Sequence, residues 1–262
     1  MRLREDLPSE ERIGQRDLTR WTSTGGRWLV SAVLRTSGWA TANMVLAISV
    51  VAGAGLVLGM TAASAEIYEA VDEGDGISRW DRPVLQTAIG LRTVANTQVA
   101  TVFTHLGGPL WMTVIAACIT LAMTLAWRSR TPLLLMVIGV AGSLTMTTVG
   151  KSIVGRVRPP LADAVPPFEH SPSFPSGHTL NSTVIAGLVA YLVLRRLTSR
   201  LAMVVTVALA VAWAAAMGLS RVFLGHHWLT DVAVGWTLGL SWVGVLIFAH
   251  RLFLTVLRRR AA

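Results

Sequence analysis

The chain has 262 residues, of which 53% are hydrophobic and 14% are charged, whereas a soluble globular domain carries about 25% charged residues. This composition excludes an ordinary soluble domain and predicts an integral membrane protein. The formal net charge is +9, but the arginines occur at the ends of apolar segments and not on a polar face, which argues against a nucleic-acid-binding domain.

The N-terminal part is expected to be a tail followed by one membrane span. Residues 1–38 are charged and polar and predict a cytoplasmic tail. Residues 39–62 are apolar and long enough to cross a hydrocarbon core of about 30 Å, which takes roughly 20 helical residues. The end of this stretch, Ala63-Ser64-Ala65, resembles a signal-peptidase site. The long polar leader and the full spanning length favour an uncleaved span over a signal peptide.

An acidic region and then an amphipathic region follow the first span. Residues 66–81 contain six carboxylates and are expected to form a solvated loop. Between Val84 and Phe103, apolar residues recur at near-helical spacing among polar ones, and this stretch is not apolar enough to span. We therefore expect an interfacial helix between spans 1 and 2, lying at the membrane surface or covering a site.

Five further apolar runs complete a prediction of six transmembrane helices. None of them contains Lys or Arg, and they extend approximately over residues 110–127, 133–150, 180–194, 201–219 and 229–249. Gly235 and Gly239 form a G-x-x-x-G pattern in the last run, which predicts close helix packing. The expected fold is an all-α membrane protein with its spanning domain over residues 39–252 and a basic C-terminal tail over residues 253–262.

Arginines in the short connections predict the orientation of the spans. They follow the second, fourth and sixth spans at Arg128, Arg130, Arg195, Arg196, Arg200, Arg251, Arg258, Arg259 and Arg260. Together with the arginine-rich N-terminal tail, they place both termini in the cytoplasm by the positive-inside rule. The loops over residues 63–109, 151–179 and 220–228 are then extracytoplasmic.

The last two of these loops, with their borders, carry three clusters of cations and imidazoles. Lys151 is the only lysine among 23 basic residues, and it lies where an apolar run meets a proline-rich loop. The clusters comprise Lys151, Arg158 and Pro159, then Pro175, Ser176, Gly177 and His178, then Ser220, Arg221, His227 and Asp231. Because all three lie on one face of the membrane, they indicate a single anion site suited to phosphate chemistry.

In order and spacing, these residues resemble the three-part signature of the type 2 phosphatidic acid phosphatase (PAP2) superfamily. The resemblance extends from about residue 100 to residue 250 and includes the six-span layout, but it leaves the N-terminal tail outside. It implies a PAP2-like helical core and a membrane phosphatase. Such an enzyme would hydrolyse a lipid phosphate or pyrophosphate on the extracytoplasmic face.

Fixed cations at these positions have a clear chemical use. Negative charge spreads over the oxygens of a phosphate ester during displacement, and enzymes stabilise it with positioned cationic donors. Lys151, Arg158 and Arg221 supply three positive charges. In similar enzymes the serine hydroxyl and the glycine backbone N–H at the positions of Ser176 and Gly177 also donate to the phosphate. Glycine permits the close approach of the backbone.

The resemblance also assigns the reacting groups. His227 is expected to be the nucleophile, which attacks phosphorus to form a phosphohistidine that water then hydrolyses. Asp231 follows four residues later, so on a helix the two side chains share a face, and the carboxylate can fix the tautomer of the imidazole. His178 is expected to be the general acid that protonates the leaving group and then helps to activate water.

No metal ion or other cofactor is expected. Asp163 and Glu169 are too few and too unsuitably spaced for a two-metal cage. Cys118 is the only cysteine and falls within an apolar run, so a disulfide framework and a cysteine-based metal site are not expected either.

The remaining basic side chains are given other roles. Arg156 falls outside the motif positions and is expected to line the loop or to contact a second phosphate. His226 is one residue away from the register of His227 and Asp231, so we expect it to pack or to lie at the interface. His105, His170 and His250 are expected to be loop or interface residues.

Several functions are compatible with this sequence. The favoured substrate is an isoprenyl pyrophosphate such as undecaprenyl pyrophosphate, with phosphatidylglycerol phosphate and phosphatidic acid as alternatives. A phosphotransferase would use an acceptor other than water. Vanadium haloperoxidases use the same residue constellation to hold vanadate, but they are soluble, and six spans argue against this alternative. A non-enzymatic lipid-phosphate binder has no use for an acid and an oriented nucleophile. The expected partners are the bilayer and a lipid phosphate, not nucleic acid, and the oligomeric state is left open.

Overall fold

The computed structural model describes residues 11–14, 16–36, 44–53, 55, 59 and 77–261. The described part is almost entirely helical. Its long helices are α6 (Pro109–Trp127), α7 (Thr131–Val154), α8 (Gly177–Leu194), α9 (Arg200–Phe223) and α10 (Leu229–Ala261). Shorter elements are β1 (Arg12–Ile13), β2 (Arg16–Asp17), α2 (Thr24–Thr36), η1 (Ile77–Trp80), α4 (Asp81–Gly90), α5 (Val94–Leu106) and η2 (Leu161–Asp163). The two strands form a small antiparallel pair.

Helices α6 to α10 are each long and apolar enough to cross a membrane, which makes five candidate spans within the described residues. They correspond to the second to sixth spans expected from the sequence. Half of the first expected span, residues 39–62, and the whole motif at residues 63–65 lie outside the described residues. Within that span, a shorter apolar helix covers Met44–Gly53.

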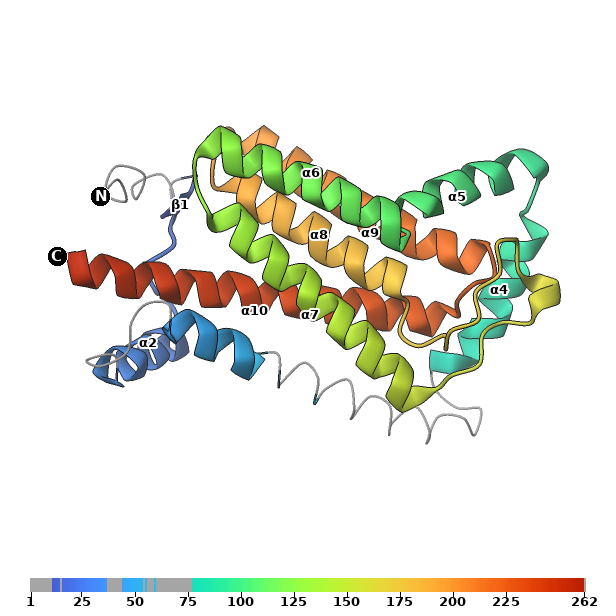
Figure 1. The fold of residues 1–262 in the computed structure, drawn as a ribbon, viewed down its shortest axis with the longest axis horizontal. Helices are drawn as coiled ribbons and strands as arrows, with labels where there is room; N and C mark the ends of the chain where they lie inside the picture. Colours follow the sequence, from blue (N-terminus) through green and yellow to red (C-terminus); the bar gives the residue numbers. More distant parts are fainter. Residues whose placement is uncertain are drawn as a thin grey trace.

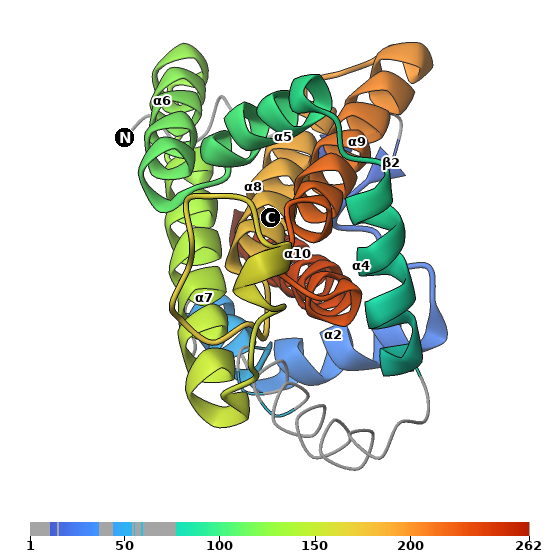
Figure 2. The same cartoon turned by 90° about the vertical axis from the view of Figure 1, so that its right-hand side faces the viewer.

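Helix α8 lies at the centre of the bundle. It packs against α7, α9 and α10 (Figure 2). Of the five candidate spans it has the largest share of buried residues, 56%. One hydrophobic cluster joins α6, α7, α8 and α10 and includes Met136, Leu188, Trp242 and Leu246. Such close packing leaves little freedom to the helix that begins with the Pro-Ser-Gly-His sequence.

Two glycines let α10 approach α8 closely, as the sequence predicts. A Cβ at Gly239 would lie 2.8 Å from the Cβ of Thr183, and a Cβ at Gly235 would lie 3.0 Å from the Cβ of Thr179. The distance at Gly239 is too short for a real side chain, and the distance at Gly235 is tighter than most real Cβ contacts, so glycine at both positions suits this packing. The contact holds the start of α8 against the first turns of α10.

The bundle has two different ends. Helices α4 and α5 and the loop between α7 and α8 lie at the right-hand end of Figure 1, and the α6–α7 connection, β1 and the C-terminal part of α10 lie at the left-hand end. At the left-hand end, Arg251 Nε donates to the Leu18 carbonyl over 2.9 Å and Arg258 pairs with Asp17 over 2.8 Å. The positive-inside rule predicts that this arginine-bearing end faces the cytoplasm.

Three details differ from expectation. The stretch expected as one interfacial helix consists of α4 and α5, because Thr93 starts a new helix by forming a capping box with Asn96. Residues 253–261, expected as a tail, continue α10. The assignment of His250 to a loop or interface is wrong, because its side chain is buried and its Nδ1 lies 2.8 Å from Tyr191 Oη.

Candidate active site

The residues of the three sequence clusters meet at the end of the bundle that carries α4 and α5. Each comes from the end of a helix or from a loop: Lys151 from the last turn of α7, Arg158 from the α7–α8 loop, Ser176, Gly177 and His178 from the start of α8, Arg221 from the last turn of α9, His227 from the α9–α10 turn and Asp231 from the first turn of α10. The structure therefore brings the three sequence clusters together at one end of the bundle.

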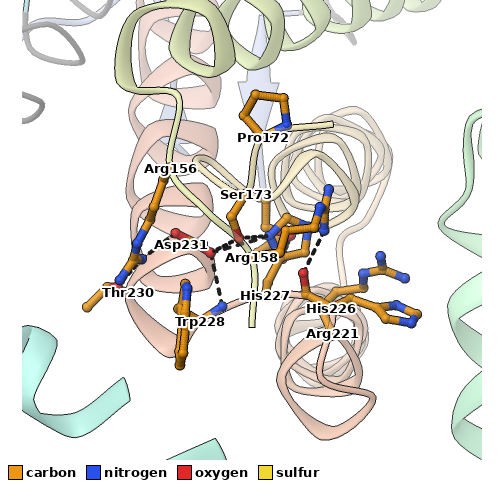
Figure 3. A network of polar contacts seen from close by, with 12 residues as sticks. Arg156, Arg158, Pro172, Ser173, Arg221, His226, His227, Trp228, Thr230 and Asp231 are labelled. Carbon is orange, nitrogen blue, oxygen red and sulfur yellow. Dashed lines mark hydrogen bonds and ion pairs between the residues drawn. The ribbon is translucent and has the colours of Figure 1, made fainter. Parts of the chain in front are cut away.

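His227 and Asp231 lie side by side at the start of α10 (Figure 3). His227 Nδ1 is 3.4 Å from Asp231 Oδ2, and His227 Nε2 is 3.2 Å from Nη1 of Arg158. Because a guanidinium can only donate, this second contact assigns the lone pair of the imidazole to Nε2 and its proton to Nδ1. The carboxylate therefore lies behind Nδ1, while Nε2 is on the side of the arginine.

The imidazole of His227 is neutral at pH 7. Burial lowers the pKa of His227 to about 4, and the nearby guanidinium groups of Arg221 and Arg158 act in the same direction, although Asp231 opposes them. A neutral imidazole keeps the lone pair that nucleophilic attack requires.

Asp231 is fully buried, and both of its carboxylate oxygens accept hydrogen bonds. Oδ2 accepts from Ser173 Oγ over 2.5 Å and from the backbone N–H of Trp228 over 3.0 Å, and Oδ1 accepts from Arg156 Nη1 over 2.5 Å. Ser173 Oγ also lies 3.3 Å from His227 Nδ1. These contacts compensate the buried charge and hold the carboxylate in one orientation. Sequence reasoning did not identify Ser173, which lies in a loop without any informative periodicity.

Arg156 connects Asp231 with helix α4. Its Nη2 lies 2.7 Å from Asp81 Oδ2, and Asp81 also accepts from the backbone N–H of Thr230 over 2.9 Å and from Thr230 Oγ1 over 2.7 Å. Burial alone would lower the pKa of Arg156, but Asp231 and Asp81 outweigh it and raise the pKa above its usual value. The expected solvated position of Asp81 is wrong, since this residue is only 3% exposed.

Arg158 and Arg221 share the carboxylate of Glu169. Oε2 of Glu169 lies 2.7 Å from Arg158 Nη2, and Oε1 contacts Arg221 Nη2. Burial alone would raise the pKa of Glu169, but Arg221 and Arg158 lower it to about 2, so the group is ionised at neutral pH. Two arginines from different segments thus hold one anion between them, an arrangement that also suits phosphate oxygens.

Other groups fix the two guanidiniums. Arg158 Nε donates to the carbonyl of Ser171 over 2.7 Å, and its Nη1 donates to the carbonyl of His226 over 2.6 Å. Arg221 Nη1 donates to Thr104 Oγ1 over 3.0 Å, whereas its buried Nε has no hydrogen-bond partner among the described residues. Thr104 comes from α5, so a helix outside the predicted motifs contributes to the site.

Lys151 contacts the α7–α8 loop. Its Nζ donates to Ser171 Oγ over 3.1 Å and also to the carbonyl of Pro172. Ser171 Oγ in turn lies 3.2 Å from Arg158 Nη2. The lone lysine of the chain is thereby tied to the same loop segment as Arg158.

Ser176 and Gly177 are placed where α8 begins. Ser176 is fully buried and its Oγ accepts from Thr179 Oγ1 over 2.9 Å, while its backbone N–H donates to the Asp231 carbonyl over 3.2 Å. A Cβ at Gly177 would lie 3.0 Å from Thr147 Cγ2, so glycine permits close packing on α7. The first N–H groups of a helix have no intrahelical partner and favour anions.

A cavity of about 360 Å³ opens at the same end of the bundle, next to Arg221 and His178. Its polar lining includes Glu169, His178, Arg221, His226 and His105, and its apolar lining includes Pro109, Leu110, Trp111 and Phe168. Leu110 and Trp111 are also largely exposed on the outer surface of the helices. Cationic groups next to an apolar, outward-facing wall suit a molecule with an anionic head and an apolar tail. His226, expected to pack, does so through Nε2, 2.7 Å from the Val165 carbonyl.

The charges of the site favour an anion. The carboxylates of Asp81, Asp231 and Glu169 all face arginine side chains. Among the residues that the structure describes, no group of three or more His, Cys, Asp or Glu side chains is arranged to hold a metal ion. The donor set is therefore suited to phosphate oxygens.

Comparison with known proteins identifies the family. The family model of the PAP2 superfamily matches residues 131–253. Phosphatidylglycerophosphatase B of Bacillus subtilis is 31% identical over 177 residues, which cover 66% of this chain and 85% of the relative. A crystal structure described as the first transmembrane PAP2 type phosphatidylglycerolphosphate phosphatase from Bacillus subtilis matches with a TM-score of 0.63 and 27% identity, over 74% of this chain and 92% of that chain. The resemblance found in the sequence is confirmed, and this chain belongs to the PAP2 superfamily.

Proposed function

We propose that this membrane phosphatase transfers the phosphoryl group of a lipid phosphate first to His227 and then to water. The observation that carries the proposal is the anion contact of Arg158 and Arg221, which hold one carboxylate between them, while Nη1 of the same Arg158 lies 3.2 Å from Nε2 of a neutral His227. Membership of the PAP2 superfamily and the phosphatase named among its relatives support a phosphate ester as the substrate.

The proposed reaction has two displacement steps. Arg158 and Arg221 bind phosphate oxygens where they now contact Glu169, and Lys151, Ser176 and Gly177 stabilise the remaining charge. His227 Nε2 attacks phosphorus as the bond to the leaving oxygen breaks, and His178 gives that oxygen a proton. In the second step His178 takes a proton from water, the water oxygen attacks phosphorus, and the P–N bond breaks.

Asp231 acts on this chemistry through His227. Its carboxylate holds the proton of Nδ1 and stabilises the positive charge that the imidazole gains when Nε2 becomes phosphorylated. Arg156 is a positioning residue in this scheme, because it fixes Asp231 from the opposite side and does not contact Nε2. Asp81 and Thr230 in turn fix Arg156.

Phosphatidylglycerol phosphate is the substrate that the comparisons favour. The relative with 31% identity is named phosphatidylglycerophosphatase B, which corresponds to one of the alternatives from the sequence and not to the isoprenyl pyrophosphate favoured there. The cavity beside His178, with its apolar wall of Leu110, Trp111 and Phe168, supports a lipid with an anionic head group.

The active site is proposed to face the extracytoplasmic side of the membrane. The site lies at the end of the bundle opposite the α6–α7 connection (Figure 1), which contains Arg128 and Arg130. Short connections rich in arginine favour the cytoplasm. Phosphate release from substrate added to sealed, right-side-out vesicles tests this placement.

Phosphate release by the purified protein in detergent tests the proposed function. The panel contains phosphatidylglycerol phosphate, phosphatidic acid and an isoprenyl pyrophosphate, with a metal chelator present throughout. We expect release that the chelator does not abolish, that is fastest with phosphatidylglycerol phosphate and that is lost in His227→Ala. Loss of activity with chelator contradicts the mechanism, and turnover that requires an added alcohol acceptor identifies a phosphotransferase.

A further inference from the structure

Glu169 lies where the proposed mechanism requires phosphate oxygens. Its two carboxylate oxygens contact Nη2 of Arg158 and Nη2 of Arg221, and these are the guanidiniums assigned to the phosphate. The carboxylate belongs to the α7–α8 loop and lines the same cavity as His178. A phosphate that binds both arginines must therefore displace Glu169.

We propose that Glu169 is a built-in competitor of the substrate, a tethered carboxylate that sets the minimum affinity a phosphate needs to enter the site. This inference rests on the proposed function, because it takes Arg158 and Arg221 to be the phosphate-binding residues. It concerns a residue outside the matching signature of the PAP2 superfamily.

The geometry allows the carboxylate to leave. The side chain of Glu169 is 30% exposed, whereas that of Arg221 is only 2% exposed, so the carboxylate can turn into water while the guanidinium stays in place. Both arginines have other hydrogen-bond partners that hold them, in the Ser171 carbonyl and in Thr104. The anion position is therefore preformed, and only its present occupant is mobile in this exchange.

A dianionic phosphate has two advantages over this carboxylate. It carries about twice the charge, and the attraction to the two guanidiniums grows in proportion. It also has a third oxygen. Nε and Nη2 lie on the same edge of a guanidinium and can donate in parallel to one anion. Glu169 contacts only Nη2 of Arg221, and the buried Nε has no hydrogen-bond partner among the described residues. A phosphate oxygen can satisfy this donor.

A singly charged phosphodiester has a much smaller advantage over the Glu169 carboxylate than a dianionic phosphate has. It exchanges one negative charge for another and competes with a carboxylate whose tether gives it a high effective concentration, in the millimolar range or above. The product of the favoured reaction, phosphatidylglycerol, is such a diester, as are many membrane lipids. The return of Glu169 to the arginines would therefore expel product and keep these lipids out of the site.

Simple competition makes a quantitative prediction. When only a fraction of the protein is competent to bind, the apparent affinity of every ligand falls by that same fraction. Removing the charge of Glu169 should therefore increase the apparent affinity of every ligand of the anion position by one common factor, whatever the charge of the ligand. A residue that contacts the substrate directly would instead change the affinities of different ligands by different factors.

The test compares Glu169→Gln with Asp163→Asn. The second variant removes one charge from the same loop, but the charge of Asp163 acts on Arg92, whereas the charge of Glu169 acts on the two phosphate-binding arginines. We measure the KM for a phosphomonoester lipid and the inhibition constants of orthophosphate and of short-chain phosphatidylglycerol in mixed micelles. Glu169→Gln should lower all three by a common factor of about ten, and Asp163→Asn should leave them unchanged.

The outcomes separate this inference from the proposed function. If the wild type releases phosphate but Glu169→Gln leaves the three constants unchanged, raises them or changes them unequally, the competitor role is wrong and the function stands. If the wild type releases no phosphate, the function itself is wrong. Glu169→Asp, whose shorter side chain keeps the charge but cannot reach both arginines equally well, should give an intermediate factor, and thermal unfolding of each variant checks that it is folded.

Discussion

Arg156 and Asp231 form a buried ion pair in which Nη1 lies 2.5 Å from Oδ1. The other nitrogen of the same guanidinium, Nη2, lies 2.7 Å from Asp81 at the start of α4. A helix that carries none of the superfamily signature thereby holds the carboxylate behind His227. The orientation of the proposed nucleophile depends on this chain of buried charges, and its disruption should affect turnover more than binding.

Replacement of Arg156 by lysine should lower kcat with little change in KM. Lysine keeps the charge but lacks the planar fork that reaches Asp231 and Asp81 together, so Asp231 loses part of its support. We expect a decrease in kcat of roughly tenfold or more, as for other groups that orient a reacting residue. Steady-state kinetics of Arg156→Lys measure it, with Arg79→Lys, a substitution of an exposed arginine in η1, as the control. An increase in KM at constant kcat would show that Arg156 binds substrate instead.

Thr104→Val should weaken substrate binding. The variant removes the hydroxyl that accepts from Arg221 Nη1, and loss of one hydrogen bond to a charged group costs about 1.5–3 kcal/mol, which corresponds to a KM increase of roughly 10-fold to 100-fold. Thr101→Val is the matched control, because Thr101 lines the same cavity but donates to the Thr97 carbonyl within α5. Equal KM values for the two variants would contradict a role of Thr104 in positioning Arg221.

The pH dependence of kcat/KM should reflect the low pKa of His227. The imidazole attacks in its neutral form, and with a pKa of about 4 it becomes protonated only when the pH falls toward 4, not near the usual value of about 6.5. The substrate phosphate also titrates, so profiles of two substrates with different phosphate pKa values are compared. A decrease in kcat/KM at acid pH that both substrates share belongs to the enzyme. If this shared decrease occurred near pH 6.5, it would contradict a buried, neutral His227.

Gly239→Ala should destabilise the bundle. The new Cβ would lie 2.8 Å from the Cβ of Thr183, and overpacking of this kind costs about 1–3 kcal/mol. Gly244→Ala on the same helix is the control, since nothing lies within 4 Å of its Cβ position, and alanine favours helix over glycine. Thermal unfolding in detergent should show a lower midpoint for Gly239→Ala alone. Equal midpoints would mean that α8 and α10 can separate without cost.

The sequence was sufficient to predict the central helices and the signature residues. Runs such as residues 133–150 and 201–219 are uninterrupted by charge, and the structure places α7 and α9 there with only a few extra residues at each end. The four-residue spacing of His227 and Asp231 predicted a shared side, and the two side chains lie 3.4 Å apart at the start of α10. His227 lies in the turn just before α10 and not in the helix itself, but a separation of four residues is short enough for the contact to be read from local sequence.

Contacts between distant segments could not be predicted in the same way. Asp81, Thr104 and Ser173 come from three separate segments and contact Arg156, Arg221 and Asp231, respectively. Each is a common polar residue in a stretch without a motif. Asp81 belongs to an acidic region for which a solvated loop was the natural expectation. Glu169 was considered only as a metal ligand, because nothing in its sequence context indicates that two arginines converge on it.

Detection of the covalent intermediate tests the central claim most directly. In His178→Ala, a phosphate ester with a good leaving group needs no general acid for the first step, whereas hydrolysis of the intermediate lacks its base, so the phosphoenzyme should accumulate. The protein is incubated with such a ³²P-labelled ester, quenched in alkali and mapped by mass spectrometry. We predict an acid-labile, alkali-stable phosphate on His227, retained when the adjacent His226 is replaced by alanine and absent in His227→Ala. Phosphate release from wild type without label on His227, or label on another residue, would contradict the mechanism.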